Sequence, residues 1–362
     1  LFGGGFRIDD DLGNPDIEPE IKTEWEVGAD FRFLRDALSL SFTYYQNQID
    51  GILLNRDLSP SSGFDTQYGN FGAMENKGFE TDITWAAIQK TDMNLSFNAN
   101  WSTNENLVTD LQGTETISLG GGSVDSRAVV GYPLGVLFGT GSQMDEAGNF
   151  ILDDNGFPQT TASPMVLGDP NPDWRGGLGF NFNWKNLGLN FLIEHSQGGE
   201  FSPRTLWVLR RFGTTQETAN RLTLDQDLVN FDGDVIPAGT TVRGNIENFG
   251  GGDVLLDETW YRHGIGGGFG DNQAYNFAIQ DATYTKIREL TLTYALNGDG
   301  FTEKTKLRNV VLGVSARNLF AWTKIDGIDP ETNQIGVGSG FGVEYFTNPQ
   351  TRSYLFSLTI NY

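Results

Sequence analysis

Oxygen-bearing side chains gather in one stretch, MDEAGNFILDDNGFP (144–158), and oxygen is the ligand atom that calcium prefers. The candidate ligands are Asp145, Glu146, Asp153, Asp154 and Asn155. Their spacing is not that of an EF-hand loop, and the segments AGN and DNG within the stretch are typical of hairpin turns. Calcium binding and turn formation are thus alternatives, here and in the acidic stretch RIDDDLGNPD (7–16), and turn formation is the simpler one.

Few other residues have the chemistry of an active site. The chain has no cysteine and two histidines, His195 and His263, which excludes a thiolate nucleophile, a disulfide and a histidine-rich metal site. The run GIGGGFGDN (264–272) has glycines spaced as in nucleotide-binding loops, but no alternating strand and helix pattern surrounds it. No Ser-His-Asp spacing is present. We therefore predict neither an enzyme nor a bound cofactor.

The composition of the chain limits the classes of partner that it can bind. With 24 basic and 47 acidic residues the net charge is −23, which repels phosphate backbones, so no nucleic-acid partner is expected. The longest nearly apolar run, AVVGYPLGVLFG (128–139), contains Pro133 and is shorter than the ~18 residues of a spanning helix. The chain opens on Leu1 and not on methionine, so we expect it to be the later part of a longer polypeptide.

Charged and apolar side chains alternate along much of the chain. In EWEVGADFRF (24–33), Trp25, Val27 and Phe31 share one face and the charged residues share the other. The same alternation recurs in segments 38–45, 79–87, 93–101, 178–184, 187–193, 290–296, 310–318 and 353–362. A period of two with aromatic and β-branched enrichment is typical of strands, so the fold class is all-β.

Strand length and loop length favour a transmembrane antiparallel β-barrel over a soluble sandwich. Aromatic residues recur eight to ten positions apart, as in the pairs Trp174 and Trp184, Tyr284 and Tyr294, and Tyr354 and Tyr362. A tilted strand of that length covers roughly 19–24 Å, near the ~25 Å apolar band of an outer-membrane barrel. Short connections are predicted at 35–38, 88–91, 185–186 and 297–306, and long external loops at 46–75, 102–173, 197–281 and 321–351.

The predicted spanning strands number nine if 102–173 is one external excursion. The last strand then runs toward the periplasm. Bacterial single-chain barrels have even strand numbers, so we expect this chain to close a barrel only together with earlier strands.

Several phrases of the chain resemble one known family, the SusC/RagA-type TonB-dependent outer-membrane transporters of the Bacteroidetes. The resemblance covers nearly the whole chain and rests on six phrases in the family's order: NPDIEPEIKTEWEVGADFRFL (14–34), NFGAMENKGFETDITW (70–85), VVGYPLGVLFG (129–139), GDPNPDWRGGLGFNFNW (168–184), DATYTKIRELTLTYAL (281–296) and ARNLFAWTKIDGIDPETN (316–333).

This resemblance implies that residues 1–362 are the C-terminal portion of a 22-stranded barrel and supply its last nine strands. It implies an integral protein of the cell outer membrane, in contact with its lipid, that imports glycans or peptides beneath a SusD-like surface lipoprotein. The family's plug, signal peptide and TonB box have no counterpart here, so contact with TonB would occur through an N-terminal region absent from this chain.

Three groups of residues are functional candidates. The last strand resembles the signal by which the barrel-assembly machinery captures its substrates, through Tyr354, Phe356, Leu358, Ile360 and Tyr362. The candidates for the polar lumen, which would line a substrate path or anchor the plug, are Glu24, Glu26, Asp30, Arg32, Glu80, Asp82 and Arg317. The loop aromatics that would contact substrate or the lid protein are Trp207, Trp260 and Tyr261.

Two other functions stay open from the sequence. A SusC-like barrel without transport would be a structural or accessory subunit of a larger outer-membrane assembly, and a TonB box upstream would distinguish an importer from it. A soluble adhesin or glycan-binding sandwich would instead leave the membrane fraction without detergent.

Overall fold

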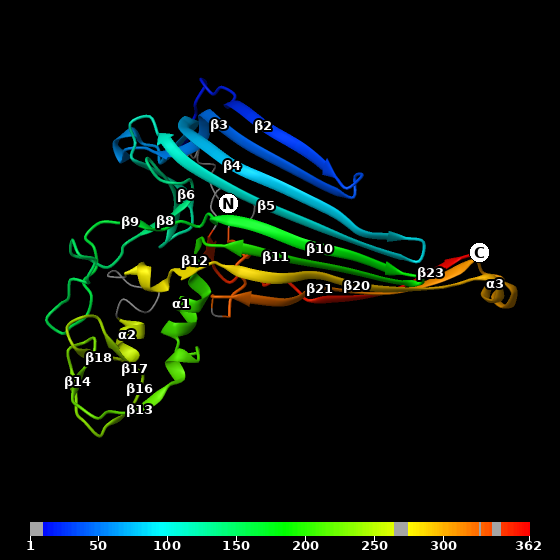
Figure 1. Ribbon diagram of the computed structural model, residues 1–362. Coiled ribbons are helices and arrows are strands. Elements are labelled where there is room, and N and C mark those ends of the chain that lie inside the picture. The colour runs from blue at the N-terminus through cyan, green and yellow to red at the C-terminus, as the bar shows by residue number, and fades with distance from the viewer. Residues whose placement is uncertain (1–9, 264–273, 326, 335–341) are drawn as a thin grey trace, which may run out of the picture.

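The computed structural model describes residues 10–263, 274–325, 327–334 and 342–362. Nine strands lie side by side in one antiparallel sheet, which we call the wall (Figure 1). In spatial order they are β2 (Ile21–Phe33), β3 (Leu38–Asp57), β4 (Thr66–Lys90), β5 (Met93–Asp110), β10 (Trp174–Trp184), β11 (Leu187–Gln197), β20 (Tyr284–Asn297), β21 (Asn309–Thr323) and β23 (Ser353–Asn361).

The connections alternate in length, as predicted. At one end of the wall the strands are joined by residues 34–37, 91–92, 185–186 and 298–308. In the first of these turns Leu34, Arg35 and Asp36 all have positive φ, a conformation that reverses the chain within few residues. The long connections lie at the other end, where the smaller elements gather, apart from the short helix at 299–305 in the last of these turns (Figure 1).

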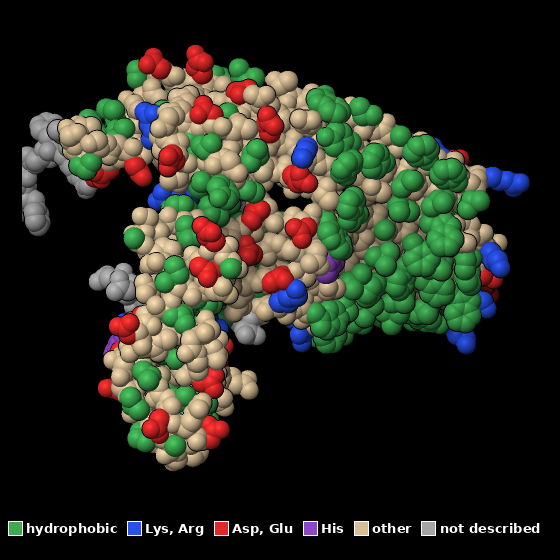
Figure 2. Space-filling view, turned by 60° about the vertical axis from the view of Figure 1, so that its left-hand side comes forward, with side chains coloured by type: hydrophobic (Ala, Val, Ile, Leu, Met, Phe, Trp, Pro, Cys, Tyr) green, Lys and Arg blue, Asp and Glu red, His purple; other side chains and the backbone are tan. Residues whose placement is uncertain are grey.

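The outer face of the wall is apolar and exposed. Register places Leu358 of β23 opposite Leu312 of β21, and the side chain of Phe356 is 76 % exposed. Figure 2 shows a continuous field of hydrophobic side chains over the wall toward the end with short connections. A soluble sandwich would bury such faces against each other. A single layer with an exposed apolar face fits contact with lipid instead.

The first loop is shorter than predicted. Residues 46–75 were expected to be a loop, but β3 continues to Asp57 and β4 begins at Thr66, so the connection is 58–65 with the short η1 (Pro60–Ser62). Likewise β5 reaches Asp110, so the second loop starts at 111 and not at 102. Above the bilayer the strands no longer need an apolar face, so the ladder continues without the alternation that would reveal it.

Small sheets and helices occupy the long connections. The four strands β6 (Thr116–Gly120), β7 (Asp125–Val129), β8 (Val136–Gly139) and β9 (Met165–Gly168) form one sheet, so segment 128–141 is not a wall strand, as predicted. Two-stranded ladders pair β13 (Arg221–Thr223) with β16 (Thr241–Arg243), β14 (Leu228–Val229) with β15 (Val235–Ile236), and β17 (Asn245–Asn248) with β18 (Asp253–Leu256).

The remaining elements are short strands and helical turns. β12 (Glu200–Pro203) pairs with β19 (Gln280–Asp281) and with β22 (Val343–Glu344), and β1 (Asp11–Leu12) pairs with β4. Helical turns occur at α1 (Arg204–Arg211), η2 (Glu217–Ala219), α2 (Glu258–Arg262), η3 (Tyr275–Ala278) and α3 (Asp299–Thr305). The sequence predicted no helix, because segments of five to eight residues are too short to display a helical period. Among the described residues, no helix has the length and apolarity needed to cross a membrane.

Hydrophobic cores lie in the loops. We call residues 111–168, 204–263 and 274–278 the outer lobe. One of its clusters joins Phe157, Val254 and Trp260, and another joins Val124, Leu137 and Trp207. A third cluster packs Leu54 and Phe71 at the wall's outer end against Ile117 of the lobe. These cores hold the lobe together and fix it over one end of the wall.

Candidate functional site

The polar side chains of β2 and of its neighbour β3 lie on the same side of the wall. Register pairs Glu24 with Asn47, Glu26 with Tyr45, Asp30 with Ser41 and Arg32 with Ser39, and the exposed apolar residues of β2 point to the other face. Glu80 and Asp82 of β4 continue the same rows, opposite Ser102 and Asn100 of β5. The alternation therefore places six of the predicted lumen candidates, Glu24, Glu26, Asp30, Arg32, Glu80 and Asp82, on one face.

A hollow of about 430 Å³ lies between these rows. The Tyr45 Oη donates to Asn104 Oδ1 at 2.9 Å, and Asn47 Nδ2 donates to Glu24 Oε2 at 3.0 Å. A Cβ at Gly78 would meet the Tyr45 ring, so the absence of a side chain there lets the phenol lie flat across β4. The hollow therefore presents fixed hydroxyl, amide and carboxylate groups on the inner face.

A second hollow, of about 370 Å³, follows along the same face. Glu80 and Asp82 line one side and Arg175 and Glu194 the other. Farther along, Arg317 of β21 faces Glu289 of β20 at 3.4 Å, but the Arg317 side chain is largely exposed and the pair is weak. The inner face as a whole is polar and suits either water and a polar solute or another polar protein surface.

A buried charge cluster closes the outer end of this face, and the sequence did not predict it. Lys286 Nζ lies 2.6 Å from Asp329 Oδ1 and also contacts Glu331. Arg288 bridges Glu331, through Nη1 to Oε2 at 2.8 Å, and Glu194, through Nε to Oε2 at 2.7 Å. The cluster attaches the loop that carries Asp329 and Glu331 to the strands β11 and β20 (Tyr284–Asn297).

Glu331 stays ionised within this cluster. Burial by itself would raise the pKa of its carboxyl, but hydrogen bonds from Arg288 and Lys286 outweigh that effect and lower the pKa to about 2. The attachment of the loop therefore persists at any pH well above that value.

A bulge in β20 explains why Tyr284 and Tyr294, both at even-numbered positions of one strand, lie on different faces of the wall. Ile287 and Glu289 pair with successive residues of β11, so Arg288 is an extra residue in the ladder. The alternation shifts by one there, and Tyr284 turns inward, where it is buried and donates to Glu331 Oε1 at 3.0 Å. Tyr284 therefore does not share the outer face with Tyr294, the aromatic with which the spacing pairs it, whereas Tyr294 is exposed on that face.

The three loop aromatics predicted to contact substrate or the lid are buried, which corrects that expectation. Trp207 stacks on Tyr275 at 5.1 Å between ring centroids and donates to the carbonyl oxygen of Ala278. Trp260 is 4 % exposed and packs within the lobe's core. The Tyr261 Oη donates to Glu217 Oε1 at 3.1 Å, and burial together with the Glu217 charge raises the pKa of this phenol. These rings stabilise the outer lobe, and Tyr261 also lines a cavity of that lobe.

The acidic stretch 144–158 forms turns, the simpler of the two interpretations. Asp145 Oδ1 accepts from the amides of Ala147 and Asn149, at 2.9 and 2.8 Å. Asp153 Oδ1 does the same for Asn155 and Phe157, at 2.9 Å each. Hydrogen bonds from Asn149 lower the pKa of Asp145. Over the residues that the structure describes, no group of acidic residues or histidines is arranged to hold a metal ion.

Two predicted features fall partly or wholly outside the described residues. In the stretch 7–16, residues 7–9 lie outside them, and Asp11 is in contact with Thr66. The glycine run 264–272 lies wholly outside.

The closing strand has the geometry that its alternation predicts. Register places Tyr354, Phe356, Leu358 and Ile360 opposite the outward residues of β21. Tyr362 follows the last residue of β23 and is 92 % exposed. Within the described chain β23 has a ladder partner on one side only, as does β2 at the other edge of the wall.

The chain is similar in sequence to known receptor proteins. The family model described as TonB dependent receptor-like, beta-barrel matches residues 2–203. TonB-dependent receptor P3 of Formosa agariphila is 24 % identical, over 97 % of this chain and 35 % of its own length. TonB-dependent receptor SusC of Bacteroides thetaiotaomicron is 22 % identical, over 96 % of this chain and 32 % of its own length.

A solved structure, that of the RagAB peptide transporter, matches 97 % of this chain and 36 % of its own chain, with a TM-score of 0.68 and 19 % identity. This likeness concerns the fold. The chain spans about a third of the length of the curated relatives that it matches.

Proposed function

This chain belongs to the TonB-dependent receptor β-barrel family of the outer membrane, and from that premise we propose that it forms part of the wall and outer loops of an energy-coupled importer. Residues 1–362 would be the C-terminal portion of the barrel domain. The importer takes up glycans or peptides together with a SusD-like surface lipoprotein. TonB acts through the N-terminal plug region, and the barrel-assembly machinery recognises the closing strand.

One observation carries this proposal: the wall has two faces of opposite chemistry. Its outer face presents apolar side chains such as Phe356 and Leu358, and its inner face presents fixed polar groups such as Tyr45, Glu80 and Arg175. A wall of this kind separates lipid from a polar interior, which is what the passage of a polar solute requires. The family consists of transporters, which agrees with the expectation that the chain is not an enzyme.

The inner face has two uses within an importer. Its carboxylates and Arg175 contact the solute directly, or they bind the plug that occupies the barrel before transport. Glu80 of β4 lines both of the hollows described above, so this one carboxylate is placed to contact either a solute or a plug. The outer lobe stands over the same end of the wall, where a lid protein and an incoming solute would arrive.

The experiment is an uptake assay with the full-length receptor and its partner lipoprotein in cells. Fluorescent oligosaccharides and fluorescent peptides are offered separately, with TonB present and with TonB depleted. We expect one class to accumulate inside the outer membrane only when TonB is present. A receptor that is inserted in normal amount but supports no TonB-dependent uptake of either class would instead be an accessory subunit.

A further inference from the structure

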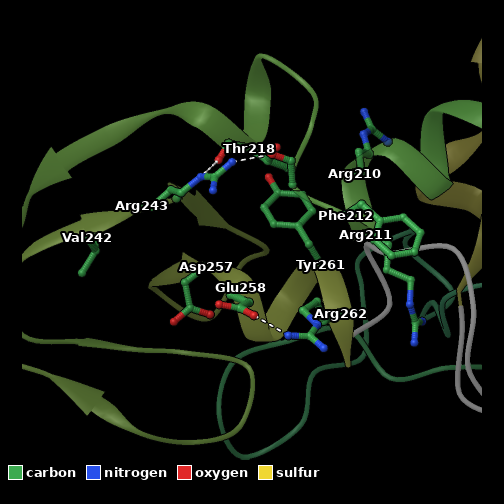
Figure 3. A pocket seen from close by; sticks show the side chains of 12 residues that line it. Arg210, Arg211, Phe212, Thr218, Val242, Arg243, Asp257, Glu258, Tyr261 and Arg262 are labelled. Carbon is green, nitrogen blue, oxygen red and sulfur yellow. Dashed lines mark hydrogen bonds and ion pairs between the residues drawn. The ribbon is translucent and has the colours of Figure 1, made fainter.

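A cavity of about 800 Å³ opens in the outer lobe (Figure 3). The end of α1 contributes Arg210 and Arg211, β16 contributes Arg243, and α2 contributes Arg262. Four arginines therefore border one cavity in a chain whose net charge is −23. Its volume is in the range of ordinary ligand pockets.

Within the described chain, carboxylates pair with Arg210 and Arg262 and not with Arg243. Arg210 pairs with Glu217 at 2.8 Å and Arg262 with Glu258 at 2.6 Å. Asp257 is occupied by neutral donors, since it accepts from the amide of Thr259 at 2.8 Å as the cap of α2. It also accepts from Asn230.

Arg243 is the centre of the uncompensated charge. Its guanidinium donates to the main-chain oxygens of Thr218 and Gly213, which are neutral acceptors, and no carboxylate of the described chain forms an ion pair with it. Directly across the ladder from Arg243 lies Arg221, on the same face of the β13–β16 pair. Two like charges opposite each other destabilise a ladder unless an anion lies between or beside them.

The chemistry of the lining specifies the ligand. Guanidinium groups match the planar oxygen pairs of carboxylate and sulfate groups and bind them bidentately. Phe212 adjoins Arg211 in the lining, and its ring is 73 % exposed, which leaves a flat apolar surface for a sugar ring. The one strand in the lining, β16, has three residues, which is too short for the extended edge pairing by which a strand binds a peptide.

We propose that this cavity binds an acidic sugar unit of an oligosaccharide, with Arg243 and Arg262 holding its carboxylate or sulfate group and Phe212 contacting its ring. This proposal adds a substrate class to the proposed function. It rests on that function only in one respect, that the outer lobe faces the outside of the cell.

The test is calorimetric titration of the purified full-length receptor in detergent, which requires neither TonB nor transport. The probes are an oligogalacturonate, a sulfated oligosaccharide, a neutral oligosaccharide of equal length, a hexaglutamate peptide and inorganic sulfate. We expect one of the acidic oligosaccharides to bind at least about tenfold more tightly than the neutral one, and the two acidic probes distinguish carboxylate from sulfate recognition.

Variants locate the binding. Arg262→Gln changes a partly exposed side chain and should lower the affinity for the acidic oligosaccharide about tenfold. Phe212→Ala should lower this affinity several-fold. Arg308→Gln, an exposed arginine at the opposite end of the wall, is the matched control and should change nothing. Arg243→Gln adds a second test, with circular dichroism to verify that the lobe stays folded.

Four results would overturn the site: equal binding of acidic and neutral sugars, equal or tighter binding of hexaglutamate, heat from inorganic sulfate alone, or unchanged binding in both Arg262→Gln and Phe212→Ala. An importer of other solutes would give these results and keep its TonB-dependent uptake. An accessory subunit without transport would lack uptake and still bind the acidic sugar.

Discussion

The wall and the outer lobe use apolar side chains in opposite ways. In the wall they lie on an exposed face, where Phe356 and Leu358 contact no other layer of the described chain. In the lobe they are removed from solvent, and Phe157 and Leu255 are fully buried. The wall therefore depends on its surroundings for hydrophobic stabilisation, whereas the lobe provides its own interior. The same residue types make a membrane surface in one region and a water-soluble core in the other.

The largest effect should come from the lobe's core. Trp260→Ala removes a ring that lies 5.6 Å from Phe157 and 5.5 Å from Phe249, and the cavity left behind should cost about 3–5 kcal/mol of local stability. Pulse proteolysis of the full-length receptor would detect cleavage in residues 221–262 while the wall stays intact. Trp184→Ala on the wall's exposed face is the control, and an equal loss there would abolish the distinction between the regions.

A charge placed on the wall tests the other half of the comparison. Leu358→Arg should cost roughly 2–4 kcal/mol in a bilayer, because the guanidinium would enter hydrocarbon near the midplane. Ser357→Arg points to the inner face and should cost far less. A folding titration from detergent into bilayers measures both variants, and similar losses would contradict the assignment of the two faces.

The smallest effect concerns the attachment between the two regions. Glu331→Gln should cost about 2 kcal/mol, because it weakens the charged hydrogen bonds from Arg288 and Lys286. The folded-state pKa of Glu331 is about 2, below its ordinary value of 4.5, so its stabilisation is complete above about pH 4.5 and is lost as the pH falls through about 2.

Limited proteolysis with an acid-active protease across this range would follow the loop that carries Glu331. Cleavage there should rise as the pH falls in the native receptor, and should be higher and nearly independent of pH in Glu331→Gln. Glu247→Gln, at an exposed carboxylate of β17, is the control. A native receptor without any pH dependence would mean that the charge cluster does not hold the loop.

The sequence predicted the wall better than the lobe, for a physical reason. In a strand between lipid and a polar interior, facing follows from parity alone, so Glu24 and Trp25 reveal their sides without knowledge of the partner strands. In the lobe, whether a side chain is buried or exposed depends on its packing against segments that are distant in the sequence. Trp207 meets Tyr275, and Phe157 meets Trp260, and no local pattern announces either contact. Hence the loop aromatics were expected at the surface and lie inside.

The candidate sites divide in the same way. The polar rows of β2 and β4 follow from alternation, whereas the charge cluster depends on a loop that returns from residues 329–331 to β20. The arginines of the lobe cavity come from three separate elements between residues 204 and 262, and only tertiary structure brings them together. A run of arginines without neighbouring acids would have been the one available signal, and Arg210 and Arg211 are the only adjacent pair there.

The bulge at Arg288 reverses the alternation of side chains along β20. On the periplasmic side of it, odd-numbered residues point inward, and on the outer side even-numbered residues do, so one continuous strand carries two phases. In a regular ladder without this bulge, the Lys286 side chain would point toward lipid and away from its carboxylate partners. Ile287 would then point toward the polar interior. A single inserted residue thereby decides whether the loop above has a cation to hold it.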